Sequence, residues 1–420
     1  MDKFIVRGGR KLQGTVNISG SKNAALPILI AGLLIEKGET VVKNVPNLAD
    51  IGTVLNVLKH LGVKTVWDKE EHIVGLDASN LNNHEAPYDL VRKMRASFLV
   101  MGPLLARLKK ARVSLPGGCV LGPRPVDYHL KAFAALGAKI VDEGGYVSAK
   151  VGSLRGTVIH FDKPSHTGTE NVMMAACLAK GKTTIINAAC DPEVVDVARF
   201  LILAGAKITG VGSTIIEIEG VKSLKPIEYS VMPDRLEAGT FMMAAGITGG
   251  DIMVKPRCES YMGIVVAKLR NAGLDFKFYK SGIRVSRPGS MGAINLTTFP
   301  YPGFPTDLQA SIMAMCCVAE GISHIQETVF TDRFTHVMEL ARLGADIKIA
   351  GQEAAITGVK KLKGTSIMAS DIRAGAGLVV AALAAGRKSE ILRIYHIDRG
   401  YEKIEAKLQE LGADIKRQQV

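Results

Sequence analysis

The sequence has few aromatic residues and no apolar run long enough to cross a membrane. Among its 420 residues there is one Trp, and Phe, Trp and Tyr together make up 5%. The longest uncharged apolar runs, 24–35 and 374–386, fall short of the roughly 20 residues that a spanning helix needs. The first residues, Met-Asp-Lys-Phe, do not have the pattern of a signal peptide, so we expect a cytoplasmic protein.

The cysteines and glycines also lack the spacing of common metal and nucleotide sites. None of the six cysteines forms a C-x-x-C pair or a metal-like group with histidines, which argues against structural zinc and disulfides. The phosphate-binding pattern G-x-x-x-x-G-K-[ST] does not occur. We therefore expect neither a metal nor a cofactor.

Aliphatic residues, by contrast, are abundant. Hydrophobic residues make up 47% of the chain, and cores of Ala, Val, Ile, Leu and Met are typical of layered α/β proteins. Because 420 residues exceed the usual size of a single core, the length predicts two domains.

The net charge of +13 suits two kinds of partner, nucleic acids or small anionic substrates. Nucleic-acid binders usually carry dense basic runs with aromatic residues between them. The tightest basic clusters here, residues 109–112 and 360–363, are short and contain no aromatic residue. The charge pattern therefore favours small anions.

An internal repeat runs through the whole chain. A helix-like segment ends in a Leu-Gly or Ala-Gly turn and enters a β-like run six times, and glycine is the usual residue at such a helix end. The six glycines are Gly62, Gly137, Gly205, Gly273, Gly344 and Gly412. Successive glycines lie 68 to 75 residues apart, so six units of about 70 residues account for the chain.

Three repeats form each predicted domain. The first domain is expected to span residues 22–232, and the second residues 233–420 together with 1–21. The last repeat is about twenty residues short, and the strand-like runs 3–6 and 15–18 at the start of the chain would complete it.

Each repeat also contains a second, strongly apolar helix with polar residues near its start. These starts lie near Lys22, Arg92 and Arg95, Thr169, Asp234, Asp307 and Arg373. Thr169 and Asp234 are typical helix caps, and Glu237 suits the first helical turn. The cations among these residues oppose the helix dipole, and cations combined with helix N-termini create anion sites.

The segment 114–129, SLPGGCVLGPRPVDYH, is rich in glycine and proline and is therefore predicted to be a loop. It brings a thiol (Cys119) near a guanidinium (Arg124), and the prolines on either side of Arg124 restrict its backbone. One interpretation is a reactive loop. The other is a surface turn with an incidental cysteine, because free cysteines are usually buried hydrophobes.

Four motifs, in this order, resemble the enolpyruvyl transferases. They are Ser-Lys-Asn-Ala-Ala-Leu at 21–26, Pro-Gly-Gly-Cys with Arg-Pro-Val-Asp within 116–127, Pro-Thr-Asp-Leu-Gln at 305–309 and Asp-Ile-Arg-Ala-Gly at 371–375. The resemblance covers essentially the whole chain. It implies an α/β fold of two similar inside-out barrel domains, each of three repeated helix-strand units, with the active site in the interdomain cleft and the loop 114–129 on the first domain.

The resemblance also implies a reaction, the transfer of the enolpyruvyl group of phosphoenolpyruvate to the 3-hydroxyl of UDP-N-acetylglucosamine with release of phosphate. This is the first committed step of peptidoglycan biosynthesis. It requires no nucleic acid, membrane or obligate protein partner. The loop with cysteine and Arg-Pro-Val-Asp favours the UDP-sugar as acceptor over the alternative acceptor, 3-phosphoshikimate.

The substrate contacts follow from the same resemblance. At phosphoenolpyruvate it places Lys22, Asn23, Arg95, Arg124, Arg373 and Arg399, and cations suit phosphate and carboxylate oxygens. At UDP-N-acetylglucosamine it places Asn23, Arg95, Arg124, Pro125, Val126, Asp127, Tyr128, Lys163, Ser165, His166, Asp307 and Val329. Tyr128 and the run 164–166 depart from the usual motif, so we expect backbone contacts there.

The implied chemistry needs a base, an acid and electrostatic clamps. Asp307 is expected to take the proton of the sugar hydroxyl, and Cys119 to donate a proton and to bond covalently to the pyruvyl group. Asp371 would help to deprotonate the intermediate, with Lys22 and Arg399 as the remaining catalytic residues. Cationic neighbours favour the thiolate of Cys119, which cannot donate a proton until it is reprotonated.

A nucleic-acid-binding protein of the related RNA 3'-phosphate cyclase fold is the alternative from another functional class. It would use the net charge of +13. A steep dependence of RNA affinity on salt would support it, and tight binding of UDP-N-acetylglucosamine would oppose it.

We predict that Cys119 is the cysteine alkylated fastest by small anionic electrophiles, and the resemblance implies fosfomycin as one of them. UDP-N-acetylglucosamine should accelerate the labelling. Cys119→Ser should abolish labelling and strongly reduce turnover, whereas Cys119→Asp should retain activity and escape the inhibitor, because a carboxylic acid also donates a proton. Mass spectrometry of the labelled peptides tests this. Labelling mainly at another cysteine, or full turnover by the serine variant, would remove Cys119 from the mechanism.

Overall fold

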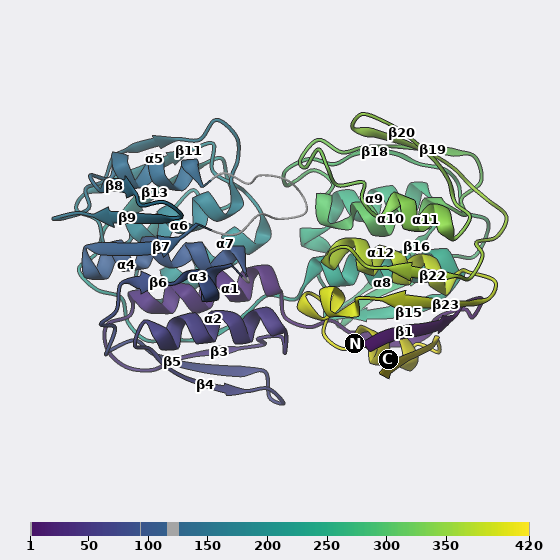
Figure 1. Cartoon of the computed structure of the whole chain (residues 1–420), viewed down its shortest axis with the longest axis horizontal. Helices are drawn as coiled ribbons and strands as arrows, with labels where there is room; N and C mark the ends of the chain where they lie inside the picture. The colour runs from purple at the N-terminus through teal and green to yellow at the C-terminus, as the bar shows by residue number, and fades with distance from the viewer. Residues whose placement is uncertain (1, 93, 116–125, 420) are drawn as a thin grey trace. The chain divides into compact units, whose positions relative to one another are not determined.

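The computed structural model describes residues 2–92, 94–115 and 126–419. The described residues form two compact units (Figure 1). The first unit contains residues 20–115 and 126–232, and the second contains residues 2–19 and 233–419. The sequence had placed the first boundary after residue 21. It lies after Ser19 because Gly20 packs on the first unit, where an added Cβ would lie 1.7 Å from the Asn44 carbonyl oxygen.

Three four-stranded sheets form in each unit within the described residues. In the first unit they are, in spatial order, β14 (Glu228–Ser230), β3 (Thr40–Lys43), β5 (Ile73–Asp77) and β4 (Lys64–Asp68); β6 (Glu85–Ala86), β7 (Lys110–Ser114), β9 (Tyr146–Lys150) and β8 (Lys139–Asp142); β10 (Val158–His160), β11 (Lys182–Ile186), β13 (Ile215–Glu219) and β12 (Lys207–Thr209).

The sheets of the second unit have the same plan. They are β2 (Gln13–Asn17), β15 (Asp251–Lys255), β17 (Gly282–Ser286) and β16 (Asp275–Tyr279); β18 (Asn295–Thr297), β19 (Ile322–Gln326), β21 (Glu353–Thr357) and β20 (Asp346–Ala350); β22 (Ser366–Met368), β23 (Lys388–Leu392), β1 (Asp2–Arg7) and β24 (Asp414–Gln419). In all six sheets the first pair is parallel and the others are antiparallel.

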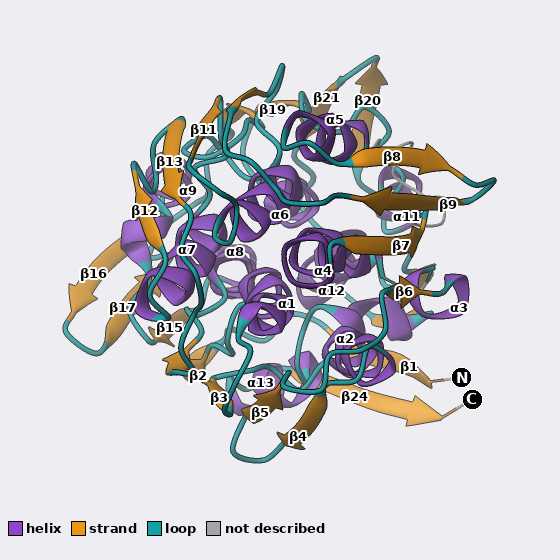
Figure 2. Cartoon of the chain, turned by 90° about the vertical axis from the view of Figure 1, so that its left-hand side faces the viewer, coloured by secondary structure: helices purple, strands orange, loops and turns teal. Residues whose placement is uncertain are grey.

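Each unit encloses inner helices that are apolar on almost every side. They are α1 (Lys22–Ala31), α4 (Met101–Leu108) and α6 (His166–Ala176) in the first unit, and α8 (Arg235–Thr248), α10 (Gln309–Cys316) and α12 (Ile372–Leu383) in the second. Figure 2 shows α1, α4 and α6 enclosed by strands and outer helices of their own unit. In the second unit, α8, α10 and α12 contact one another. Burial on all sides explains their lack of an amphipathic pattern.

The outer helices bury one side only. They are α2 (Ala49–His60), α5 (Asp127–Ala135), α7 (Pro192–Leu203), α9 (Gly263–Asn271), α11 (Val337–Arg342) and α13 (Ile404–Glu410). Short turns of helix complete the fold: η1 (Gly32–Leu34), α3 (Tyr88–Val91), η2 (Arg95–Val100), η3 (Glu259–Tyr261), η4 (Thr306–Leu308) and η5 (Ile394–Arg399).

The six predicted glycine turns are confirmed. All six glycines that define the repeat follow an outer helix and have positive φ angles, between 87° and 106°. Non-glycine residues rarely adopt such angles, so these positions fix where each outer helix stops. The predicted α/β fold of two similar units, each of three repeats, is confirmed as well.

The first strands pair with the second unit, as the repeat arithmetic predicts. β1 lies between β23 and β24 and takes the place of the fourth strand of the sixth repeat. β2 pairs with β15. Phe4 and Val6 of β1 belong to the buried core of the second unit.

Two predicted helix starts are wrong. The cap of α6 is Ser165, which accepts a hydrogen bond from the Gly168 amide, whereas Thr169 lies inside the helix and accepts from the Ala189 amide. Arg92 is not near the start of an inner helix but follows α3, and it is exposed and faces Asp89 at 3.4 Å. The inner helix of this repeat begins at Met101, because Pro103 is tolerated only in a first turn.

The pairing of β1 makes a testable prediction about local stability. Phe4→Ala should cost about 3–5 kcal/mol, because Phe4 is fully buried in the second unit. Amide hydrogen exchange should then accelerate first in residues 233–419. Phe200→Ala is the matched control, because Phe200 is equally buried in the first unit, and it should accelerate exchange in residues 126–232 instead. Exchange that accelerates first in the first unit of the Phe4 variant would contradict the assignment.

Candidate active site

Asp307 lies in η4, at the start of the inner helix α10, and both of its carboxylate oxygens accept hydrogen bonds from guanidinium groups. Arg333 Nη2 donates to Oδ1 at 2.8 Å, and Arg373 Nε donates to Oδ2 at 3.1 Å. The two arginine side chains are each 6% exposed, and the Asp307 side chain is 26% exposed. A carboxylate that is the predicted base is therefore held between two buried cations.

Arg373 has a nitrogen left over for a ligand. It lies in the first turn of α12, and its guanidinium stands over the Tyr401 ring at 5.4 Å. Burial alone would lower the pKa of Arg373, but Tyr401 and Asp307 outweigh it and raise the pKa above its usual value. Its buried Nη1 has no hydrogen-bond partner among the described residues. A buried, permanently charged donor of this kind suits an anionic oxygen.

A buried glutamate organises the loop beside Asp307. Glu327 Oε1 accepts from the backbone amides of Val329 and Phe330 at 2.9 and 3.0 Å. Its Oε2 accepts from the Thr306 hydroxyl at 2.8 Å, and that hydroxyl also accepts from Arg333. This network connects Val329, one of the predicted UDP-N-acetylglucosamine contacts, to the segment that carries Asp307.

Asp371 caps the helix that carries Arg373. Its Oδ1 accepts from the amides of Arg373 and Ala374, both at 2.9 Å, and its Oδ2 accepts from the Ser370 hydroxyl at 3.2 Å. Arg399, half-buried, ends η5, and this segment packs against α12. The structure thus brings the predicted residues Asp307, Asp371, Arg373 and Arg399 to neighbouring segments of the second unit.

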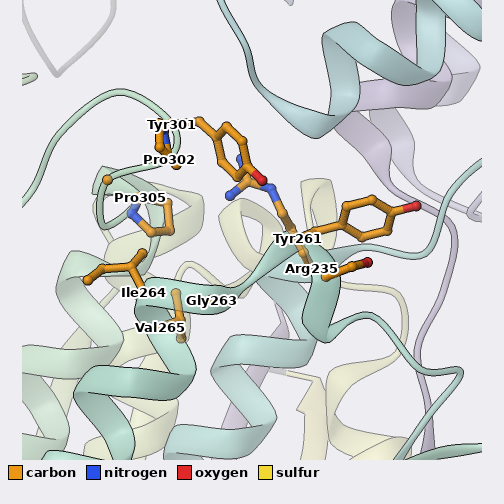
Figure 3. Close-up of a pocket in the computed structure, with 10 residues that line it drawn as sticks. Arg235, Tyr261, Gly263, Ile264, Val265, Tyr301, Pro302 and Pro305 are labelled. Atoms are coloured by element: carbon orange, nitrogen blue, oxygen red, sulfur yellow. The ribbon is translucent and has the colours of Figure 1, made fainter. Parts of the chain in front are cut away.

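A small cavity borders the same segment of the second unit. It has a volume of about 130 Å³, and its lining includes Arg235, Tyr261, Tyr301 and Pro305. Figure 3 shows the Arg235 side chain next to Tyr301, and the guanidinium carbon lies 5.5 Å from the ring centre. Pro305 directly precedes η4, so the cavity lies beside the chain that positions Asp307.

In the first unit, Lys22 and Asn23 open the inner helix α1. Ser21 caps this helix, and its hydroxyl accepts from the Ala24 amide. Lys22 Nζ lies 3.5 Å from Asp50 Oδ2, and the two side chains are 10% and 6% exposed. A buried lysine needs such a partner to keep its charge, and this charge lies at a helix N-terminus, where anions bind.

Several of the residues predicted for the UDP-sugar lie at the starts of α5 and α6, which contact each other. Asp127 and Tyr128 begin α5 directly after Val126, and Tyr128 lies edge-on to Phe161. Tyr128 and Phe161 also line a cavity of about 120 Å³. Lys163 is in the loop before α6, and the Ser165 hydroxyl is used as the helix cap. A ligand would therefore meet Ser165 through its backbone.

His166, at the start of α6, lies between two carboxylates. Its Nε2 is 3.1 Å from Glu170 Oε1, and its Nδ1 is 3.8 Å from Asp191 Oδ1. Burial alone would lower the pKa of His166, but the two carboxylates outweigh it and hold the pKa well above its usual value. The two carboxylates therefore favour the imidazolium form of His166, while burial also raises the pKa of Glu170.

A donor atom of His166 also lies within 4.8 Å of oxygens of Asp191 and Glu193, a spacing that a metal ion could occupy. A metal ligand must present a lone pair of the imidazole, whereas an imidazolium donates from both nitrogens. In this structure, the contacts of His166 with Glu170 and Asp191 have the geometry of an ion pair.

Several predicted site residues cannot be placed. Cys119, Arg124 and Pro125 lie outside the described residues, and for Arg95 only the backbone is described, at the start of η2. The other five cysteines are described, and Cys190 is half-buried whereas the rest are buried. Burial raises the pKa of Cys177, Cys258 and Cys316 to about 12. A thiol with such a pKa is a poor nucleophile.

The sequence interpretation missed Arg333, although the repeat contains a signal for it. Asp332-Arg333 follows the second strand of the fifth repeat, and Asp398-Arg399 follows the second strand of the sixth. Aligning the repeats would have placed both arginines at equivalent positions. Glu327 and Tyr401 had no comparable signal, because their importance comes from contacts with distant segments.

No helix among the described residues combines the length and the apolar character needed to cross a lipid bilayer.

Comparison with known proteins gives a consistent family. Residues 6–408 match the model of the family EPSP synthase (3-phosphoshikimate 1-carboxyvinyltransferase). The UDP-N-acetylglucosamine 1-carboxyvinyltransferase of Geobacter metallireducens is 54% identical over 417 residues, which cover 99% of both chains. The protein of the same name from Myxococcus xanthus is 50% identical, with full coverage of both chains.

Solved structures agree on the fold. The enolpyruvyl transferase NikO from Streptomyces tendae superposes with a TM-score of 0.91 at 22% identity, over 100% of this chain and 99% of that one. EPSP synthase from Acinetobacter baumannii superposes with a TM-score of 0.77 at 19% identity, over the full length of both.

The His166 ion pair predicts a pH-dependent stability. Because the folded pKa of His166 is raised, its contribution is complete below about pH 6.5 and is lost as the pH rises through the folded pKa. Glu170→Gln should therefore lower the free energy of unfolding by about 1–3 kcal/mol at pH 6 and by less at pH 9. Denaturant unfolding at the two pH values measures this.

The matched control is Glu353→Gln, because Glu353 faces His324 at 2.9 Å with both side chains about half exposed. It should cost less than about 1 kcal/mol at either pH. A Glu170→Gln effect that is equal at pH 6 and pH 9 would show that His166 is not held as an imidazolium.

Proposed function

Since the chain belongs to the EPSP synthase family of enolpyruvyl transferases, we propose that it transfers the enolpyruvyl group of phosphoenolpyruvate to the 3-hydroxyl of UDP-N-acetylglucosamine, with release of phosphate. Relatives named for the UDP-sugar reaction are 50% to 54% identical over essentially the full chain. This identity supports UDP-N-acetylglucosamine over 3-phosphoshikimate as the acceptor. The enzyme would act in the cytoplasm, in peptidoglycan biosynthesis.

One structural observation carries the proposal most directly, the pairing of Asp307 with Arg373. It places a carboxylate that can accept a proton 3.1 Å from a buried guanidinium that can bind an anion. An addition of a hydroxyl group to phosphoenolpyruvate needs these two groups close together. The phosphate and carboxylate of phosphoenolpyruvate suit the open Nη1 of Arg373.

The first step joins the sugar oxygen to C2 of phosphoenolpyruvate. Asp307 accepts the hydroxyl proton as the C–O bond forms, and C3 of the enol gains a proton, for which Cys119 is the proposed donor. Both Asp307 oxygens are engaged by arginines in the present state. An anion bound at the open Nη1 of Arg373 would share the positive charge that now acts on Asp307, and this would make the Asp307 carboxylate a stronger base.

The second step, an elimination, re-forms the double bond between C2 and C3. A proton leaves C3, the C–O bond to phosphate breaks, and inorganic phosphate departs. Asp371 is the proposed acceptor of this proton. It lies two residues before Arg373, at the start of α12. Arg373 and Arg399, together with Lys22 of the first unit, are the proposed clamps for the leaving phosphate and the carboxylate.

The contacts to the UDP-sugar are also part of the proposal. Val126, Asp127 and Tyr128 with Lys163, Ser165 and His166 of the first unit, and Val329 of the second, are the proposed contacts. The imidazolium of His166 adds a positive charge at the N-terminus of α6, which suits a diphosphate. No cofactor is included in the proposal.

The proposal predicts phosphate release from phosphoenolpyruvate that depends on UDP-N-acetylglucosamine. Asp307→Asn should lower kcat by about 10²–10⁴-fold, because the base is lost while the amide keeps the shape of the site. Asp332→Asn is the matched control, because Asp332 is an exposed acid directly before Arg333, the partner of Asp307, and should leave kcat unchanged. Thermal melting confirms that both variants fold.

Replacing the UDP-sugar with 3-phosphoshikimate distinguishes the two acceptors. Phosphate release with 3-phosphoshikimate alone would overturn the assignment of the acceptor. Full activity of the Asp307→Asn variant would remove Asp307 as the base.

A further inference from the structure

Arg417, on the last strand β24, holds three carboxylates with one guanidinium group. Its two terminal nitrogens donate to the two oxygens of Asp398, with Nη1 at 3.1 Å from Oδ2. Its Nε donates to Glu405 at 2.7 Å, and Nη1 also reaches Asp2 at 3.2 Å. A forked contact of this kind fixes both the position and the orientation of the Asp398 carboxylate.

Asp398 is the residue directly before Arg399. Both belong to η5, a short 3₁₀ segment that ends at Gly400. Segments of this kind depend on outside contacts to keep one conformation. Arg417 therefore contacts Asp398, the residue next to Arg399, whose side chain is proposed to bind the substrate.

The opposite side of η5 packs closely on α12. A Cβ added at Gly400 would lie 2.3 Å from Ile372 Cγ2, and one added at Gly375 would lie 2.6 Å from Ile397 Cγ1. These close contacts leave η5 little room to move relative to the helix that carries Asp371 and Arg373. The Arg399 backbone is thus held between α12 on one side and Arg417 on the other.

Arg417 is an exposed residue, but several contacts orient its guanidinium group. Its guanidinium lies 5.2 Å from the centre of the Phe4 ring, and Phe4 is fully buried. The hydrogen bond to Asp398, followed by that to Glu405, raises the pKa of Arg417 despite the opposing effect of burial, so the group stays charged at all relevant pH values. A second forked pair in the same unit, Arg284 with Asp251, has similar geometry but lies on β17 and β15, away from η5.

We propose that Arg417 is a positioning residue, which acts through Asp398 to hold Arg399 in register with Arg373 for binding the phosphoenolpyruvate anion. This inference rests on the proposed function, since Arg399 binds that anion only in the proposed reaction. The proposed role of Arg417 is distinct from a role in folding, because β24 is also held in place by its backbone pairing with β1.

The test compares Arg417→Met and Arg417→Lys with the control Arg284→Met in the full chain. For Arg417→Met we expect the KM for phosphoenolpyruvate to rise about tenfold, because a small displacement of a binding group weakens its contact. The KM for UDP-N-acetylglucosamine should change by less than about twofold, whereas kcat should fall as well, because Arg399 also holds the leaving phosphate in the proposed reaction. Arg417→Lys should give an intermediate rise, because lysine keeps the charge but not the fork.

Amide hydrogen exchange of residues 394–402 gives a readout that does not need turnover. Exchange there should accelerate in Arg417→Met and stay unchanged in Arg284→Met. The proposal is overturned if the exchange of 394–402 stays unchanged in Arg417→Met, or if Arg284→Met has the same kinetic effect. If the wild-type protein releases no phosphate, the proposed function is wrong. The exchange data would still decide whether Arg417 holds residues 394–402.

Discussion

Each unit is built around helices that are buried along almost their entire length, and the rest of the structure depends on this burial. A helix without a solvent-facing side must be covered all round, which the three sheets and the outer helices of each unit do. It must also satisfy its first amide groups without water. Ser21, Ser165, Asp234 and Asp371 do so as caps. The charged and capping side chains of these helices therefore lie mainly at the helix starts.

This confinement also explains the charges at these positions. A cation at a helix N-terminus costs stability, and burial raises that cost. Arg373 is compensated by Asp307 and by the Tyr401 ring, and Lys22 lies beside Asp50. The compensation of Arg373 is incomplete, because its Nη1 has no partner among the described residues. An anionic ligand would supply the missing hydrogen-bond acceptor for Arg373 Nη1.

The features that could be predicted from the sequence are those set by local geometry. A glycine with positive φ is required at each outer-helix end, so Gly62 and its five counterparts reveal the repeat, and the repeat in turn predicts where β1 belongs. Asp234 was also predictable as a cap, because a cap bonds only to amides two and three residues away.

The remaining features arise from contacts between distant residues. Asp307 and Arg373 are 66 positions apart, and nothing local to either residue indicates that the base would be held by an arginine. Ser165 rather than Thr169 caps α6 because the helix begins one turn earlier than its apolar pattern suggests. The late start of α4 follows from Pro103, a signal that the repeat pattern obscured.

The sixth repeat shows how such distant contacts reach the candidate site. Its sheet has the order β22, β23, β1, β24, so β24 pairs with β1 alone in the described part of the chain. If β1 detaches, β24 loses its strand partner, and Arg417 loses both the Phe4 ring and Asp2. The Arg417 side chain, which binds Asp398, would then keep fewer of the contacts that orient it. On the proposal made for Arg417, the orientation of Arg399 would depend in part on a strand from the opposite end of the chain, in addition to the direct packing of η5 on α12.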